Sequence, residues 1–164
     1  MQGIWKVPQR AGPKPRTTAT NPHQQVDQNA PGAMQEALFR RACGLPGVIA
    51  RPSQISVKGA RGFWLPKELA AGPPDAFMIG EEFAHLHPAY DGSLHMKLPF
   101  DCIAEVLAKG WGELHPSAPQ EFAPGKTVMI YGPRDEIELD VVWQILKQSY
   151  GFATGQGAGR GQAA

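Results

Sequence analysis

Histidines gather in the second half of the sequence at spacings that could bring their rings together. Four of the five lie between positions 85 and 115, and His85 and His87 stand two apart in an extended stretch. Side chains two apart in a strand face the same side of a sheet. If residues 88–92 form a five-residue hairpin loop, pairing brings His95 opposite His85, with Cβ atoms roughly 5 Å apart. The sequence thus predicts three imidazoles on one face, provided that the register does not slip by one residue.

The three converging imidazoles admit two kinds of chemistry. Neutral imidazoles can serve as general bases or as ligands of zinc, iron, nickel or copper ions. His85, His87 and His95 therefore fit either a base in a metal-free enzyme or a divalent-metal site completed by Glu81 or Glu82. Their spacing does not decide between these two possibilities. It also allows a third, in which the rings are buried and only hydrogen-bond to the backbone.

Three residues outside this trio are further candidates for the site. His115, in the predicted loop of residues 110–116, either approaches the same face or lies on the surface. Trp111 is either a core residue or an indole at the rim of a pocket for an aromatic ligand. Arg134 stands at the positive end of a predicted helix, where a cation is unfavourable. It either pairs with Glu138 or binds an anionic group of a ligand.

The elements that must position these residues follow from the apolar periodicity. Helices are predicted where apolar residues recur every three to four positions, at residues 34–43, 99–109 and 133–150, the last ending at Gly151. Extended segments are predicted at residues 48–51, 55–57, 62–65, 76–87, 93–98 and 126–132. These elements indicate an α+β fold in which a mostly antiparallel sheet is covered by two or three helices.

The length of 164 residues fits one domain with irregular ends. Residues 1–32 form a polar, Pro-rich segment whose composition favours disorder, unless it extends along the domain or wraps it. Residues 33–153 form the α+β domain. Residues 154–164 are a flexible Gly-rich tail.

The charge balance and hydropathy exclude several classes of partner. Sixteen Lys and Arg against fifteen Asp and Glu leave no excess of positive charge for nucleic acid. No run approaches the ~18 apolar residues of a membrane span, and no secretion signal is visible, which predicts a soluble cytoplasmic protein. Cys43 and Cys102 lack metal-ligand spacing and are expected to be reduced thiols. The sequence does not define an oligomeric state.

An ordered series of uncommon residues carries a resemblance to a known family. The series comprises Glu82-Phe-Ala-His-Leu-His87, Asp91, Leu94-His95, Lys109-Gly-Trp-Gly112, His115-Pro116, Tyr131-Gly-Pro-Arg134, Glu136 and Glu138. It resembles the luciferase domain of bioluminescent fungi and its bacterial relatives over residues 81–154. Residues 17–31 also resemble a stretch of the non-luminous bacterial relatives.

The resemblance implies an oxidoreductase that oxygenates a small enolisable phenol or pyrone with O₂. In the fungi the substrate is 3-hydroxyhispidin, and light accompanies the reaction. It implies molecular oxygen as co-substrate and no cofactor. The candidates for the base, and for the polar groups that hold the oxygen atoms of the substrate, are then His85, His87, His95 and His115. The candidates for substrate contacts are Glu82, Trp111, Tyr131 and Arg134. A divalent-metal enzyme and a non-catalytic protein that binds a small ligand are the alternatives, and neither nucleic acid nor a membrane is an expected partner.

Overall fold

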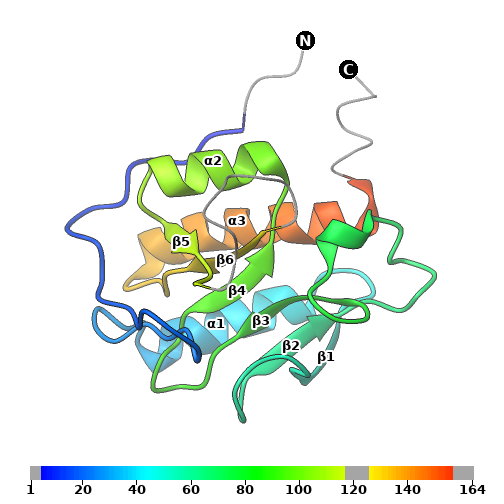
Figure 1. The fold of residues 1–164 in the computed structure, drawn as a ribbon, viewed down its shortest axis with the longest axis horizontal. Coiled ribbons are helices and arrows are strands. Elements are labelled where there is room, and N and C mark those ends of the chain that lie inside the picture. The colour runs from blue at the N-terminus through cyan, green and yellow to red at the C-terminus, as the bar shows by residue number, and fades with distance from the viewer. Residues whose placement is uncertain (1–4, 117–125, 157–164) are drawn as a thin grey trace.

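The chain folds around one six-stranded antiparallel sheet with strand order β1-β2-β3-β4-β6-β5 (Figure 1). The structure, a computed structural model, describes residues 5–116 and 126–156. The strands are β1 (Ile49–Pro52), β2 (Arg61–Trp64), β3 (Glu82–Leu86), β4 (Leu94–Lys97), β5 (Gly112–Leu114) and β6 (Thr127–Ile130). The helices are α1 (Gly32–Cys43), α2 (Phe100–Ala108) and α3 (Glu136–Thr154), with a 3₁₀ turn η1 (Pro74–Ala76). The predicted α+β class and antiparallel sheet are therefore confirmed.

The central β3–β4 hairpin has the predicted register. The two strands pair antiparallel with His85 opposite His95. The backbone N–H of His87 donates to the carbonyl of Ser93 at 2.9 Å, so the ladder continues to the ends of the loop of residues 88–92. This register places the three predicted imidazoles on one face of the sheet.

A bulge at the start of β3 changes which side chains share that face. The last two residues of β2 pair with Ala84 and Glu82, which leaves Phe83 as an extra, unpaired residue. In a regular strand Glu82 and His85, three positions apart, would face opposite sides. The bulge returns them to the same side, where their side chains meet at 2.9 Å.

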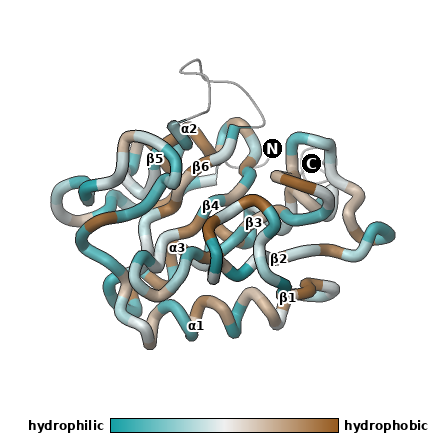
Figure 2. Tube along the Cα trace, turned by 60° about the horizontal axis from the view of Figure 1, so that its bottom comes forward, coloured by the Kyte–Doolittle hydropathy of each residue, from teal (hydrophilic) through white to brown (hydrophobic). Residues whose placement is uncertain are grey.

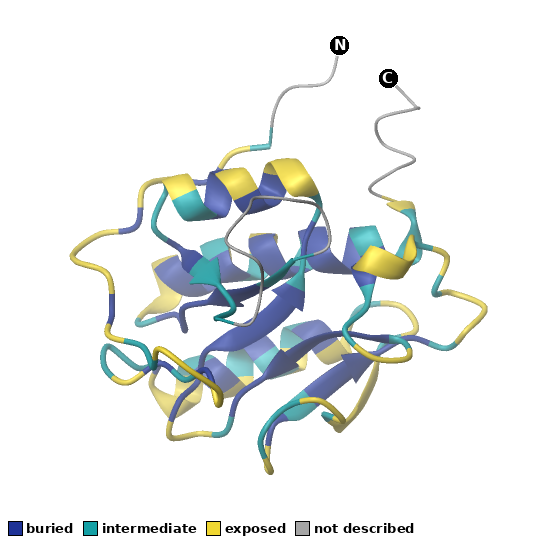
Figure 3. Ribbon diagram, in the orientation of Figure 1, coloured by how far each residue is buried: buried dark blue, intermediate teal, exposed yellow. Residues whose placement is uncertain are grey.

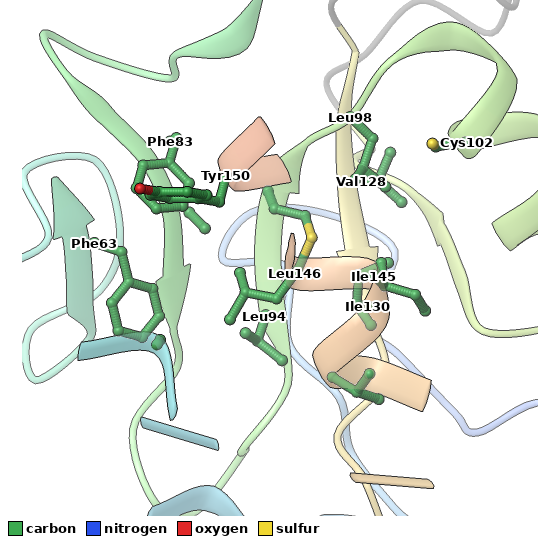
Figure 4. Packing of buried hydrophobic residues seen from close by; sticks show 14 of the residues in the cluster. Phe63, Phe83, Leu94, Leu98, Cys102, Val128, Ile130, Ile145, Leu146 and Tyr150 are labelled. Atoms are coloured by element: carbon green, nitrogen blue, oxygen red, sulfur yellow. The ribbon is translucent and has the colours of Figure 1, made fainter. Parts of the chain in front are cut away.

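The other face of the sheet packs against helices. Leu94 and Ile130 are fully buried and belong to one apolar cluster with Ile145 and Leu146 of α3 (Figure 4). Hydrophilic and hydrophobic residues alternate along α1 (Figure 2), as expected of a helix that buries one face. Burial of each large apolar side chain contributes ~1.5–3 kcal/mol. The apolar face thus secures the hairpin, and the opposite face is left for the histidines.

Helix α3 is longer than the sequence predicts. The side chain of Asp135 caps its first turn by accepting a hydrogen bond from the N–H of Glu138 at 2.8 Å. The helix continues through Gly151 and ends at Gly155, whose φ of +83° is left-handed. The prediction that Gly151 ends the helix is wrong, because the fully buried Ala153 keeps a further turn packed on the core.

Three other segments differ from prediction. Residues 55–57 bend instead of forming a strand, because Ser53 Oγ accepts hydrogen bonds from two backbone N–H groups of this loop, at 3.2 and 3.1 Å. Residues 76–81 turn at Gly80, where φ is +51°, so β3 begins later than predicted. The predicted loop of residues 110–116 contains a strand, β5.

Residues 5–31 wrap the side of the molecule next to β5 (Figure 1). They form no helix and a single isolated bridge, between Thr17 and Gln25. Their composition favours disorder, yet Val7, His23 and Gln25 are buried. Figure 3 shows buried stretches between the exposed ones along this segment. Contacts with residues distant in the sequence therefore hold this segment against the rest of the domain.

Two remaining expectations concern the thiols and the membrane. Cys43 and Cys102 are thiols that form no disulfide within the described residues, as predicted. No helix of the described residues has the length and apolar character needed to cross a bilayer. Of the predicted tail, residues 157–164 lie outside the described part of the chain.

Candidate functional site

Three imidazole nitrogens meet on the histidine face of the β3–β4 hairpin. The Nδ1 atom of His95 lies 3.2 Å from Nε2 of His85 and 2.9 Å from Nε2 of His87. All three rings are buried, with 2 to 5% of each residue exposed. The predicted convergence is confirmed, and the nitrogens lie within hydrogen-bonding distance.

A carboxylate fixes the orientation of the His85 ring. Nδ1 of His85 lies 2.9 Å from Oε2 of Glu82. The same oxygen accepts a hydrogen bond from the Ser53 hydroxyl at 2.7 Å, and Oε1 accepts one from the N–H of Gln54 at 3.0 Å. Because the carboxylate is surrounded by donors, the proton in its contact with His85 belongs to Nδ1 of the ring.

The His87 ring is held in a similar way. Its Nδ1 atom lies 2.9 Å from Oγ of Ser93 and 3.2 Å from Oδ2 of Asp91. The Ser93 hydroxyl donates its own proton to Oδ1 of Asp91. Nδ1 of His87 must therefore carry the proton that it shares with this pair. Both His85 and His87 then turn an unprotonated Nε2 toward His95.

A fourth histidine, His23, reaches the cluster from the N-terminal segment. Its Nδ1 lies 2.9 Å from Nε2 of His95, and its Nε2 lies 2.9 Å from Oε2 of Glu113 in β5. The hydroxyls of Thr17 and Tyr131 donate to the same carboxylate at 2.9 and 2.8 Å. A continuous chain of polar contacts therefore joins Glu82, His85, His95, His23 and Glu113.

Sequence reasoning does not find His23 or Glu113. His23 lies 72 residues before its partner His95, in a segment whose composition favours disorder. Its one sequence signal is its place within residues 17–31, which resemble a stretch of bacterial relatives. Glu113 falls in a segment predicted as a loop. As a strand, that segment would have put Glu113 and His115, two positions apart, on one face.

A cavity of about 570 Å³ adjoins the histidines on the side of β5. His115 and Tyr131 line it, together with two cationic residues of the N-terminal segment, Arg10 and Lys14. Of the five histidines, His115 is the one that lines this cavity, and its ring centroid lies 5.0 Å from that of His95. His115 thus connects the cavity to the buried trio.

Burial controls the charge of these groups. Burial, and then repulsion between neighbouring imidazoles, lowers the pKa of His95 well below its usual value and the pKa of His115 to about 4. Burial also lowers the pKa of His85, against the effect of the Glu82 hydrogen bond. Burial acts to raise the pKa of Glu113, but hydrogen bonds from three donors outweigh it and bring that pKa to about 2. At neutral pH the rings of His85, His95 and His115 are therefore neutral, and the carboxylate of Glu113 is ionised.

The other sequence candidates lie in different settings. Tyr131 lines the cavity, and burial followed by its hydrogen bond to Glu113 raises its pKa, which keeps the hydroxyl protonated. Trp111 packs in the apolar core, and its indole N–H donates to a backbone carbonyl of the N-terminal segment at 2.6 Å. Arg134 pairs with Glu138 and also donates to a carbonyl of the N-terminal segment at 2.7 Å. Of these three, Tyr131 is the one that borders the cavity.

Comparison with known proteins assigns this region to a family. A model of the luciferase domain matches residues 80–149. The chain is 32% identical to the luciferases of Armillaria ostoyae and Armillaria mellea over 93% and 94% of its length. Residues 80–149 belong to the luciferase-domain family. The chain spans 63% and 64% of the length of these two relatives. The luciferase of Neonothopanus nambi is 40% identical over 48% of the chain and 30% of that relative. No solved structure was found to match the chain.

The luciferase-domain match contains only part of the site. Residues 80–149 include the trio, the cavity histidine and the carboxylate of β5: His85, His87, His95, His115 and Glu113. The fourth histidine of the cluster and both cavity cations precede the match: His23, Arg10 and Lys14. The N-terminal segment therefore supplies one wall of the site.

Proposed function

We propose that this chain oxidises a small enolisable hydroxy-pyrone with O₂, in a luciferase-like reaction on a substrate of the 3-hydroxyhispidin type. One observation supports this above all: in a luciferase-domain chain, a cavity adjoins the histidine cluster and has His115 in its wall. Its volume of about 570 Å³ suits a small aromatic molecule, since small-molecule sites occupy ~300–1,000 Å³.

The proposed reaction is balanced without an external reductant. The substrate enol loses a proton, and the electron-rich enolate is oxidised as both atoms of O₂ add to it. The peroxidic product then expels CO₂, so two oxygen atoms leave with one carbon atom. The protein has to supply a base for the enol and cations for the resulting anion.

His115 is the proposed base, because it is neutral at neutral pH and lines the cavity. An enolate bound beside it would raise its pKa from about 4 toward that of an efficient base. Arg10 and Lys14 are the proposed partners of the enolate oxygen. Both cations belong to the cavity wall, where they can pair with an anionic oxygen of the substrate.

The test is to record O₂ uptake and photon emission by the full chain with 3-hydroxyhispidin in air. His115→Ala should lower kcat/KM by ~10²–10⁴-fold, the usual effect of losing a general base. Lys14→Met should raise KM about 5-fold, the equivalent of ~1 kcal/mol for a partly exposed charge.

Lys6 provides a matched control for Lys14. Both are exposed lysines of the N-terminal segment, and each pairs with a glutamate, at 3.6 Å for Lys6 and 3.3 Å for Lys14. Lys6 does not belong to the cavity wall, so Lys6→Met should leave KM unchanged. Absence of O₂ uptake by the folded wild-type chain would refute this substrate class. Uptake that survives in His115→Ala would remove His115 from the reaction.

A further inference from the structure

The buried histidine cluster has one proton fewer than its contacts require. His85, His87 and His23 each carry their proton on the nitrogen that faces a carboxylate or hydroxyl oxygen. Neutral His95 has a single proton, but both of its ring nitrogens face nitrogens that carry none. One side faces the bare Nε2 atoms of His85 and His87, and the other faces the bare Nδ1 of His23. One proton cannot serve both sides.

Either placement of the His95 proton leaves lone pairs facing each other. If the proton points to His23, three lone pairs converge at His95 Nδ1, with the neighbouring nitrogens at 3.2 and 2.9 Å. If it points to the trio, two lone pairs meet at 2.9 Å between His95 and His23. Unpaired polar atoms in a buried site are unfavourable. A cation bound by the three nitrogens, with the His95 proton pointing to His23, would satisfy every one of these contacts.

The side with three nitrogens has the geometry of a metal site. Zinc-like ions in tetrahedral sites bond nitrogen at ~2.0–2.1 Å, which separates two ligand nitrogens by about 3.3 Å. The observed separations of 3.2 and 2.9 Å need to widen by at most a few tenths of an ångström. Candidate ligand atoms of His85, His87 and His95 all lie within 4.8 Å of one another. A proton bonds covalently to one of these nitrogens, whereas a metal ion bonds all three.

The far nitrogen of each ring already has the partner that metal-bound histidines use. Glu82 holds Nδ1 of His85, and a hydroxyl and a carboxylate hold Nδ1 of His87. Nε2 of His95 can donate to His23, which in turn donates to a carboxylate. Such contacts fix the tautomer and orient the bare nitrogen toward the ion.

We propose that Nε2 of His85, Nε2 of His87 and Nδ1 of His95 bind one divalent transition-metal ion. Neutral imidazoles suit iron, nickel, copper and zinc, and three protein ligands leave a coordination position for a small molecule. The sequence favoured a cofactor-free reaction with a metal as the alternative, and the missing proton now supports the metal. Any part that the ion takes in turnover rests on the function proposed above, whereas its binding does not.

A second trio, formed by His23, His95 and His115, also brings ligand atoms within 4.8 Å. It is the weaker site, because His115 is only partly buried and meets the other two through ring contacts with centroids 5.0 and 5.2 Å apart. His95 belongs to both trios, whereas His87 belongs only to the first and His115 only to the second. Substitution of His87 and of His115 therefore discriminates between the two sites.

The experiment measures metal binding without substrate. The full chain is treated with a chelator and titrated with Co²⁺, followed by visible absorption, and with Zn²⁺ in a calorimeter. One ion per chain is expected, with the visible bands of nitrogen-bound Co²⁺. His87→Gln should lower the affinity by more than about 100-fold, beyond the effect of losing a supporting hydrogen bond. The matched variant His115→Gln should change it by less than about 3-fold.

Ring-nitrogen NMR of the wild-type chain gives a readout that does not depend on how a variant folds. Zn²⁺ should shift Nε2 of His85 and His87 and Nδ1 of His95. The proposal is overturned if the folded wild-type chain takes up neither ion, or if His87→Gln binds as tightly as wild type. It is also overturned if His115→Gln abolishes binding and His87→Gln does not. A failure to oxidise 3-hydroxyhispidin leaves all these binding results unchanged, so the two proposals fail separately.

Discussion

Replacing His23 by alanine removes a ring that bridges two buried polar groups. Nε2 of His95 and Oε2 of Glu113 each lose a partner at 2.9 Å. A buried polar group without a partner costs ~1–3 kcal/mol, so two such groups amount to about 2–6 kcal/mol. Thr17 and Tyr131 still donate to Glu113 in the variant, which offsets part of its loss. We therefore expect the free energy of unfolding to decrease by about 2–4 kcal/mol.

Urea unfolding at neutral pH in the presence of a chelator measures this loss. Val26→Ala is the control, because Val26 lies in the same segment and is 49% exposed. It should change the free energy of unfolding by less than ~0.5 kcal/mol. His23→Gln, whose amide can donate to Glu113, should recover part of the loss. If His23→Ala loses no more than Val26→Ala, His23 does not bridge the two groups, and the proton count of the cluster is wrong as well.

Three further results are expected. Glu82→Gln should lower Co²⁺ affinity by ~10–100-fold in the same titration, because the carboxylate that orients the His85 ring is lost, and unchanged affinity would contradict that role. In the metal-free chain the free energy of unfolding should decrease as the pH falls from 6.5 to about 4, because burial lowers the pKa of His115 and the unfolded chain binds the proton first. Urea unfolding across this window checks the sign, and a rise in stability would refute it. Leu94→Ala should cost ~2–5 kcal/mol because Leu94 is fully buried. Ile137→Ala, at a position that is 78% exposed, should change stability by less than ~0.5 kcal/mol in the same assay.

Local spacing was sufficient to predict the register of the β3–β4 hairpin. A five-residue loop and the alternation of His85 and His87 fix which residue stands opposite His95, and the structure has that pairing. The partner of His85 could not be predicted in the same way. Without the bulge at Phe83, the period of a strand puts Glu82 on the opposite face, and no local pattern marks the bulge.

Composition alone could not predict what the N-terminal segment contributes to the site. A polar, Pro-rich stretch cannot bury enough of its own apolar surface to fold alone. Composition does not reveal whether a folded sheet offers partners to single side chains, as it does here for His23 and Thr17. Glu113 was hidden for a related reason, because β5 has only three residues and lies in a Gly-containing stretch.

Residues 5–31 complete the site without adding a strand to the six-stranded sheet. They place His23 in the buried cluster and two cations in the cavity wall through side-chain and scattered backbone contacts. In thermodynamic terms the sheet and helices are a receptor, and this segment is a peptide ligand that the chain carries covalently. Its local concentration is set by the short connection to α1 and not by the amount of protein in solution. The same segment could thus be supplied as a separate peptide, at concentrations that would report how tightly it docks.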